Sequence, residues 1–349
     1  MGSCVMHGLF AAVVLAVWMA AGEAVTPPRK YVVNLDLPPT KRWQEVALDH
    51  KQIVPDVHKV LLEYVPEELV PYIDLIATDL DAYIDQPYAD EMRGIANVLN
   101  VSLGEILLIN VIYDLTAYCT SIVSQDQAGM IWHSRNLDYS FTDMLKNITI
   151  QVDYQRGGQT AYSSITYAGY VGILTGQRPN VFTVTVDERD QGIPLWNLIV
   201  ALFDSDVVPV SFLVRDALDA DKTFENAVSR FAYTPTAADA YFILAGVNKD
   251  EGAVVTKGRL AADDIWRLNS TNNRWYLVET NYDHWKPPPQ ADDRRDPAIK
   301  AMNAMGRPNI SVQNLFNVMS TPPVLNKGTT YTVVMSAAKP SLMQAWIRD

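Results

Sequence analysis

The sequence has very little cysteine. Only Cys4 and Cys119 occur among its 349 residues, and Cys4 lies in a leader segment that we expect to be removed. The mature chain would then hold one thiol, which excludes a disulfide bond within it. A single unpaired cysteine in a secreted chain points to a reactive thiol, although a buried and inert core cysteine would give the same count.

Long apolar runs, excess positive charge and metal-binding spacings are also lacking. No stretch of about 18 apolar residues follows the leader, so we expect the mature chain to be soluble. The net charge of -12 argues against nucleic acid as a partner, because phosphates are bound by basic surfaces. No HExxH or CxxC spacing and no GxSxG elbow of a serine hydrolase occurs. We therefore expect no metal and no cofactor.

The first 24 residues predict a signal peptide. Residues 9–21 form a short apolar run, and Gly22 and Ala24 stand at the -3 and -1 positions of a cleavage site after Ala24. Four N-x-S/T sequons in the rest of the chain predict glycosylation and so indicate the secretory pathway. Their asparagines are Asn100, Asn147, Asn269 and Asn309.

The spacing of apolar residues changes at Cys119. Upstream, it predicts helices over 56–64 and 69–84 and a third helix opened by a capping box from Ser102 to Glu105. Downstream, alternation with a period of two predicts a series of strands. These strands are 119–124, 130–137, 148–154, 161–167, 181–186, 241–245, 275–279 and 331–336, with helices near 195–203, 210–218 and 224–231 and a loop over 282–297. The order predicts an α+β fold in which helices cover antiparallel sheets.

Residues 125–129 predict a turn that joins the first two of these strands in a hairpin. If Ser124 pairs with Ile131, Cys119 lies across from Asn136. A slip of one residue would turn every side chain of the second strand to the other face. The prediction therefore specifies which residues of the second strand lie near the thiol, but not on which face of the sheet their side chains lie.

Two charged residues of the second strand fall near the thiol in this pairing. Arg135 would favour the thiolate, which is the nucleophilic form, and Asp138 could hold an ammonium group. Because they are three residues apart, both can point at Cys119 only if the strand has a bulge or ends before Asp138. A salt bridge within the hairpin is an alternative interpretation, and His133, on the same face as Arg135, leaves a cysteine–histidine pair open.

The run from Cys119 through Arg135 and Asp138 closely resembles the start of the mature β-subunit in the acid ceramidase family. This family belongs to the N-terminal-nucleophile hydrolases, together with bile salt hydrolase and penicillin V acylase. The similarity covers essentially the whole chain, including residues 279–285 (ETNYDHW) and 292–295 (DDRR). It implies a four-layer αββα sandwich with a mainly helical N-terminal subunit.

The resemblance also implies a precursor that is cut between Tyr118 and Cys119. The products would be an α-subunit (25–118) and a catalytic β-subunit (119–349) that remain together as a heterodimer. Cys119 would be the nucleophile, and its freed α-amine would be the base. Asp138 would orient this amine, and Arg135 would stabilise the thiolate and lower the pKa of the amine. An ordinary α-amine has a pKa of about 7.7–8.0, so at lysosomal pH either that pKa is depressed or the resting state is a thiolate–ammonium pair.

Three further residues take roles from the same resemblance. Asn281 would supply a contact in the oxyanion hole, Arg294 would brace the site, and Glu188 would lie near the oxyanion hole. For the other members of the charged segments 187–190 and 292–296, we expect solvated loops.

The implied activity is the hydrolysis of N-acylethanolamines, such as palmitoylethanolamide, to fatty acid and ethanolamine in the lysosome, with secretion as a further destination. Ceramide hydrolysis is the alternative, but acid ceramidase has an inter-subunit disulfide that one mature cysteine cannot form. A non-catalytic lipid carrier would have no need of the intact set Cys119, Arg135, Asp138 and Asn281. Because the substrate is nearly insoluble, we also expect peripheral contact with anionic membranes through the helices of the N-terminal segment.

Overall fold

The computed structural model describes residues 25–64, 73, 77, 84–112, 118–189 and 207–348. The predicted signal peptide, most of the predicted helix 69–84 and the predicted helix 195–203 lie outside the described residues. Within the described part, no helix is both long enough and apolar enough to cross a membrane.

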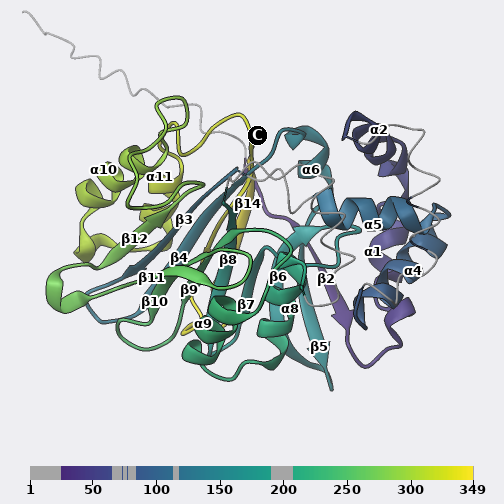
Figure 1. Ribbon diagram of the computed structural model, residues 1–349, viewed down its shortest axis with the longest axis horizontal. Coiled ribbons are helices and arrows are strands. Elements are labelled where there is room, and N and C mark those ends of the chain that lie inside the picture. Colours follow the sequence, from purple (N-terminus) through teal and green to yellow (C-terminus); the bar gives the residue numbers. More distant parts are fainter. Residues whose placement is uncertain are drawn as a thin grey trace, which may run out of the picture.

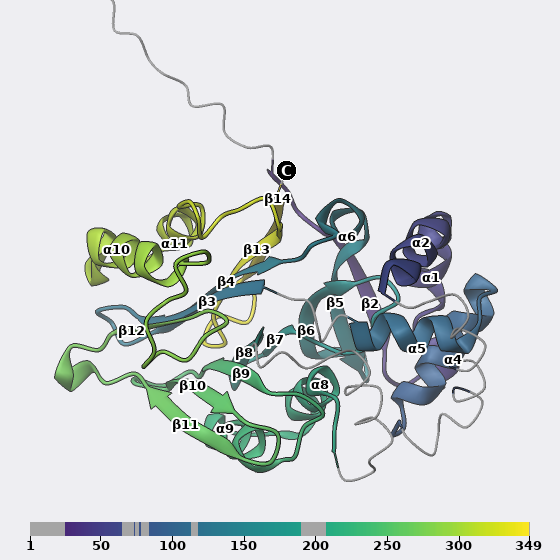
Figure 2. The same ribbon diagram turned by 45° about the horizontal axis from the view of Figure 1, so that its top comes forward.

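Two β-sheets packed face to face form the centre of the molecule (Figures 1 and 2). The six-stranded sheet has the order β1 (Val25–Thr26), β14 (Met343–Arg348), β13 (Thr329–Met335), β4 (Ile131–Asp138), β3 (Tyr118–Gln125) and β12 (Tyr276–Glu279). The eight-stranded sheet has the order β11 (Ala262–Arg267), β10 (Gly252–Lys257), β9 (Ala240–Ala245), β8 (Phe182–Glu188), β7 (Thr175–Arg178), β6 (Gln159–Tyr167), β5 (Thr149–Arg156) and β2 (Arg29–Asn34).

Helices cover the outer face of each sheet (Figure 2). Helices α10 (Arg295–Met305) and α11 (Val312–Met319) lie on the six-stranded sheet, and α8 (Val210–Ala220) and α9 (Phe224–Tyr233) lie on the eight-stranded sheet. The predicted α+β fold with four αββα layers is confirmed.

The central strands are buried on both faces because each lies between the other sheet and a layer of helices. On β3, Ile122 packs in a cluster with Met302 of α10, whereas the next residue, Val123, packs in a cluster with Ile243 and Val254 of the facing sheet. Every residue of β4 is buried. Charged groups at these positions are therefore held away from water.

The predicted elements agree with the observed ones to within two residues at each end wherever they fall on described residues. The predicted capping box is also confirmed, since the backbone nitrogens of Ser102 and Glu105 donate to each other's side chains at 3.0 and 3.1 Å. One prediction is wrong at its end: the loop predicted over 282–297 ends at Arg294, and α10 begins at Arg295. Pro297 is compatible with this helix because it lies in the first turn, where its missing N–H has no intrahelical acceptor.

The N-terminal segment is mainly helical, as predicted, but it also adds an edge strand to each sheet. Strand β1 pairs antiparallel with β14, and β2 pairs parallel with β5. Helices α1 (Gln44–Asp49), α2 (Val54–Tyr64), α4 (Tyr88–Leu99) and α5 (Leu103–Ile112) gather beside β2 at one end of the sandwich (Figure 1). The sequence analysis missed both strands because β1 is only two residues long and β2 opens with two exposed basic residues. It also missed strands β7, β10, β11 and β14, the short helix α6 (Thr142–Ile148), and helices α10 and α11, and it gave no separate bounds for α1 and α4 in the N-terminal segment.

The four predicted glycosylation asparagines lie at or near the surface. Asn100, Asn147 and Asn309 are exposed. Asn269 is half-buried, and its side chain accepts a hydrogen bond from the backbone nitrogen of Asn272. Their glycosylation stays a prediction.

A buried ion pair joins the N-terminal helices to the eight-stranded sheet's helical layer. Arg215 of α8 donates to both oxygens of Glu91 of α4, at 2.5 and 2.8 Å, and to the carbonyl of Val171 at 2.9 Å. The guanidinium also stacks on the rings of Tyr88 and Tyr154. The pair is compensated because Glu91 accepts further hydrogen bonds from Arg42 and Trp43.

We expect Arg215→Met to lower the free energy of unfolding by roughly 3–5 kcal/mol, because the variant leaves the Glu91 carboxylate buried without this partner. Urea unfolding measures the change. The matched control is Arg156→Met, which breaks a similar two-bond pair with Asp219 at the surface and should cost about 1 kcal/mol or less. Equal losses in the two variants would contradict the assignment of Arg215 as a buried anchor.

Candidate active site

Cys119 lies at the start of β3, where the exposed Tyr118 is followed by seven buried residues. Its thiol is fully buried and faces the eight-stranded sheet, with Sγ 3.8 Å from the carbonyl oxygen of Val186. It is a free cysteine.

Arg135 of β4 binds this thiol directly. Its Nη2 donates to Cys119 Sγ at 2.8 Å and to the Val186 carbonyl at 2.6 Å. Its Nη1 donates to the carbonyl of Leu174 at 2.5 Å and to the hydroxyl of Thr175 at 2.6 Å. One guanidinium therefore links the thiol to two strands of the facing sheet.

The predicted hairpin register is wrong by one residue. Ser124 pairs with Trp132, so Cys119 lies across from Leu137 rather than Asn136. The pairing of β3 with β4 is regular as far as Asp138, and the irregularity lies instead in β13, between Thr329 and Tyr331. Arg135 and Asp138 consequently lie on opposite faces of the sheet, and the expected bulge in their own strand is not needed to bring both close to Cys119.

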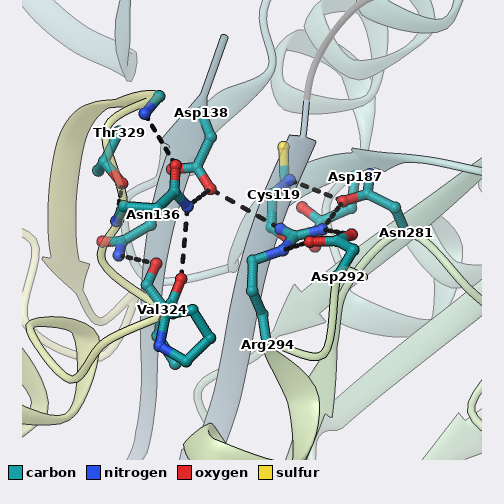
Figure 3. A network of polar contacts seen from close by, with 12 residues as sticks. Cys119, Asn136, Asp138, Asp187, Asn281, Asp292, Arg294, Val324 and Thr329 are labelled. Carbon is teal, nitrogen blue, oxygen red and sulfur yellow. Dashed lines mark hydrogen bonds and ion pairs between the residues drawn. The ribbon is translucent and has the colours of Figure 1, made fainter. Parts of the chain in front are cut away.

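On the other side of Cys119, Arg294 and Asn281 hold its main chain (Figure 3). Arg294 Nη1 donates to the Cys119 carbonyl oxygen, and its Nη2 donates to Asn281 Oδ1 at 2.7 Å. The same Oδ1 accepts the backbone N–H of Cys119 at 2.8 Å. Asp292 fixes the guanidinium of Arg294 with two hydrogen bonds of 2.7 Å. Asp138 lies 3.7 Å from Arg294 and accepts from Asn326 at 2.7 Å.

Glu188 contacts the site residue Asn281 through its main chain. Its carbonyl oxygen accepts a hydrogen bond of 2.8 Å from Asn281 Nδ2, while its side chain is half-buried. The acidic side chain that lies inside the site is the neighbouring Asp187, which is fully buried and accepts from Ser121 Oγ at 2.8 Å. The sequence analysis assigned the segment 187–190 mostly to a solvated loop and missed Asp187. Alternation along β8 could have found it, since Thr183 and Thr185 share its face.

His133 does not contact the thiol. Its two ring nitrogens lie 2.9 and 3.0 Å from the hydroxyls of Thr183 and Thr185. Burial, together with the nearby Arg135, lowers the pKa of His133 to about 3. Both nitrogens are therefore occupied and the ring is a poor base, which removes the cysteine–histidine pair left open by the sequence.

Burial is the largest influence on the pKa values of Cys119, Asp138 and Asp187. It raises the pKa of the Cys119 thiol to about 12, with Arg135 acting in the opposite direction. It also raises the pKa of Asp138 to about 6, against the effect of Arg294, and that of Asp187 to about 7, against the effect of Arg135. In the uncut chain the thiol is therefore neutral, and activation must supply a base or remove a negative charge.

A cavity of about 480 Å³ opens beside the Tyr118–Cys119 bond. It is lined by polar residues of the site, including Asp138, Asp292 and Arg294, and by the half-exposed ring of Tyr118. A water molecule or a small polar group can thus approach Tyr118 from this cavity. Among the residues that the structure describes, no group of His, Cys, Asp and Glu is arranged to hold a metal ion.

The fold has two facing sheets between helical layers and a buried cysteine at the start of a central strand. These features define the class of N-terminal-nucleophile hydrolases. The chain matches two family models. Residues 119–341 match the linear amide C–N hydrolases of the choloylglycine hydrolase family. Residues 26–84 match the model described as the beta subunit of N-acylethanolamine-hydrolyzing acid amidase. That description gives the name beta to the N-terminal segment, which we call the α-subunit.

Individual relatives agree with these matches. The chain is 44% identical to the N-acylethanolamine-hydrolyzing acid amidase of Cavia porcellus over 93% of this chain and 91% of the relative. It is 37% identical to the acid ceramidase of Homo sapiens over 91% of this chain and 86% of the relative. The solved structure of the N-acylethanolamine-hydrolyzing acid amidase orthologue of Caenorhabditis elegans is 42% identical and covers 66% of this chain and 100% of its own, with a TM-score of 0.61.

The chain therefore belongs to the choloylglycine hydrolase family of linear amide C–N hydrolases, in the branch that contains the N-acylethanolamine-hydrolyzing acid amidases and acid ceramidase. It is an amidohydrolase. The family inferred from the residues around Cys119 is confirmed.

We expect Asp138→Asn to reduce the pH dependence of stability. Because the pKa of Asp138 is about 6 in the folded chain and about 3.9 when unfolded, the folded chain binds more protons between these values. Ionisation of this carboxyl therefore lowers the free energy of unfolding as the pH rises from 4 through 6, by up to roughly 3 kcal/mol. Asparagine cannot ionise, so the variant should lack this loss. Urea unfolding at pH 4.5 and 7.5 tests it, and an equal decrease in both proteins would contradict the expected pKa.

Proposed function

We propose that this amidohydrolase hydrolyses N-acylethanolamines to fatty acid and ethanolamine, with Cys119 as the nucleophile. The observation that carries the proposal is that three polar atoms of Cys119 are each held by a different side chain. Arg135 binds Sγ, Asn281 binds the backbone nitrogen and Arg294 binds the carbonyl oxygen. Such an arrangement positions both the thiol and the nitrogen of the same residue, as an N-terminal nucleophile requires.

Self-cleavage before Cys119 would produce that nucleophile. The thiol attacks the carbonyl carbon of Tyr118, its proton passes to the Cys119 nitrogen as the peptide bond breaks, and water then hydrolyses the thioester. Two observations support this step. The exposed Tyr118 lines the cavity of about 480 Å³ through which water can enter, and the match to the linear amide hydrolases begins at Cys119. The products would be the α-subunit (25–118) and the β-subunit (119–349).

In the cleaved enzyme, the freed amine of Cys119 would take the thiol proton. Arg135 would stabilise the resulting thiolate while it attacks the substrate carbonyl. The ammonium would then protonate the departing ethanolamine, and water would release the fatty acid from the thioester. Asp138, which lines the cavity, would orient this amine. Whether the resting state is a neutral pair or a thiolate–ammonium pair depends on the pKa of the amine in the cleaved chain.

The remaining predicted residues would stabilise the tetrahedral intermediate. Asn281 would supply a contact in the oxyanion hole, since its side-chain amide is a hydrogen-bond donor and its Nδ2 is oriented by a hydrogen bond to the Glu188 carbonyl. Glu188 thus contributes by orienting Asn281. Arg294 would keep Asn281 and the Cys119 carbonyl in place through its two hydrogen bonds.

Ceramide hydrolysis by the same chemistry is the second candidate. The identity to acid ceramidase is lower, 37% against 44%, and Cys119 is the single cysteine outside the predicted signal peptide. An inter-subunit disulfide is therefore excluded in the mature protein. Direct comparison of the two substrates with one enzyme preparation decides between these activities.

Delivery through the secretory pathway to the lysosome fits the signal peptide and the four sequons. Contact with an anionic membrane would give access to an insoluble substrate. The half-buried valines Val54 and Val57 of α2 line an apolar pocket together with α1 and α5, and Leu48 of α1 is exposed. This end of the molecule is the one that we propose to meet lipid.

We expect Cys119→Ala to remain one uncut chain without amidase activity, and Cys119→Ser to cut slowly at most, because hydroxyl is a weaker nucleophile than thiolate. Intact-mass analysis after incubation at acid pH measures the cleavage, and release of ethanolamine from palmitoylethanolamide measures the activity. Circular dichroism that matches the wild type confirms folding. Full activity of the alanine variant would overturn the assignment of the nucleophile.

We expect binding to anionic vesicles to rise as the pH drops from 7 to 4.5, because carboxylates approach their pKa values and the repulsion weakens. Leu48→Asp should weaken the binding. The matched control is Leu260→Asp in the turn between β10 and β11, where the exposed leucine lies on a different element. Vesicle flotation measures both variants, and binding that depends neither on pH nor on residue 48 would show that lipid is met elsewhere.

A further inference from the structure

A buried carboxylate that the proposed mechanism does not use shares one guanidinium with the nucleophile. Arg135 Nη2 donates to Cys119 Sγ at 2.8 Å, and the same nitrogen lies 3.9 Å from Oδ1 of Asp187. All three side chains are fully buried between the two sheets, so water does not screen their charges. The thiolate and the carboxylate therefore compete for one positive charge.

We propose that Asp187 is a positioning residue that controls the ionisation of Cys119 through Arg135. While Asp187 is ionised, it neutralises Arg135 and keeps the thiol protonated. Once Asp187 is protonated, the whole charge of Arg135 is left to the thiolate. The proposal deepens the proposed function, since it concerns the same nucleophile.

The two carboxylate oxygens of Asp187 have different surroundings. Oδ1 accepts the hydrogen bond from Ser121, whereas Oδ2 is buried without a hydrogen-bond partner. A proton can therefore bind at Oδ2 without breaking the bond to Ser121. Burial places the pKa of Asp187 near 7, so the carboxyl changes charge between neutral and acid pH.

A chain of hydrogen bonds orients this carboxyl. Ser121 Oγ accepts from Thr185 Oγ1 at 2.9 Å, and Thr185 Oγ1 lies 3.0 Å from His133 Nε2. Because the pKa of His133 is lowered, its ring is neutral, and since Thr185 donates to Ser121, the ring must donate through Nε2. Every donor in the chain then points toward Asp187. The chain fixes Oδ1 and leaves Oδ2 as the site of protonation.

Other charged and titratable groups also act on Asp187. Arg294, before α10, lowers its pKa, and Asp138 of β4 raises it. Glu279 of β12 and Tyr331 of β13 are coupled to it as well, and burial raises the pKa values of both. Since Asp138 changes charge in the same range of pH, the test requires a change at Asp187 alone.

The experiment measures the thiol itself. Cys119 is alkylated with iodoacetamide at pH 5 to 8, and intact mass gives the initial rate of adduct formation on the uncut chain, counted separately from any cleaved product, for the wild type and for Asp187→Asn. We expect similar rates at pH 5, where Asp187 is protonated and asparagine resembles it. At pH 8 the variant should react at least about tenfold faster, which corresponds to a thiol pKa lower by about one unit.

The matched control is Asp153→Asn in β5, three strands from β8 in the sheet. Asp153 also accepts a serine hydroxyl, from Ser163 at 2.6 Å, so its removal tests the loss of the same kind of bond far from the thiol. The ratio of its rate to the wild-type rate should stay near one at every pH. Ser121→Ala keeps the carboxylate of Asp187 but removes the hydroxyl that donates to it. The pKa of Asp187 should then rise, so the bend in the plot of alkylation rate against pH should move to higher pH. This variant tests the proposal if Asp187→Asn fails to fold.

Two results would overturn the proposal. A ratio between Asp187→Asn and the wild type that does not change with pH would mean that Asp187 has a structural role only. Slower alkylation of the variant at pH 8 would mean that Asp187 accepts the thiol proton instead. Because no amide substrate is used, an enzyme inactive toward N-acylethanolamines would refute the proposed function and leave this test intact.

Discussion

The structure depends on one guanidinium held between two sheets. Arg135 reaches from β4 across the interface, where its fully buried guanidinium donates to the thiol of Cys119. Burying a charge costs several kcal/mol unless hydrogen bonds replace hydration, and here the carbonyls of Leu174 and Val186 and the hydroxyl of Thr175 supply that replacement. Through Nη1 and Nη2, Arg135 therefore links the nucleophile on one sheet to β7 and β8 of the other.

The main chain of the nucleophile is held from the opposite direction, by residues that enter from the end of β12 and the start of α10. Asn281 and Arg294 bracket the segment between these elements, and both bind backbone atoms of Cys119. These contacts hold the nitrogen and the carbonyl of Cys119 independently of the thiol, which Arg135 holds separately. The arrangement therefore keeps the residue in place while its thiol reacts, which suits a residue that would serve first on its own peptide bond and then on a separate substrate.

The N-terminal segment is bound to the rest of the chain by three links of two kinds. It adds β1 and β2 to the edges of the two sheets, and its helix α4 brings Glu91 to Arg215 in the core. Strand pairing and a compensated buried ion pair both persist when a peptide bond is cut elsewhere. A break at Tyr118 would thus yield two polypeptides that stay associated without a disulfide, which the single mature cysteine excludes.

The sequence by itself determined the layers, most strands and the family, because alternation along a strand and a long contiguous run of residues such as 119–139 are local properties of the chain. Tertiary structure decided the register of the hairpin, the removal of His133 from the thiol and the presence of Asp187 in the site. Asp187 meets Ser121 across 66 residues of sequence, through contact of facing sheets. No local pattern encodes such a contact, since it depends on how the inner faces of the two sheets are aligned when they pack.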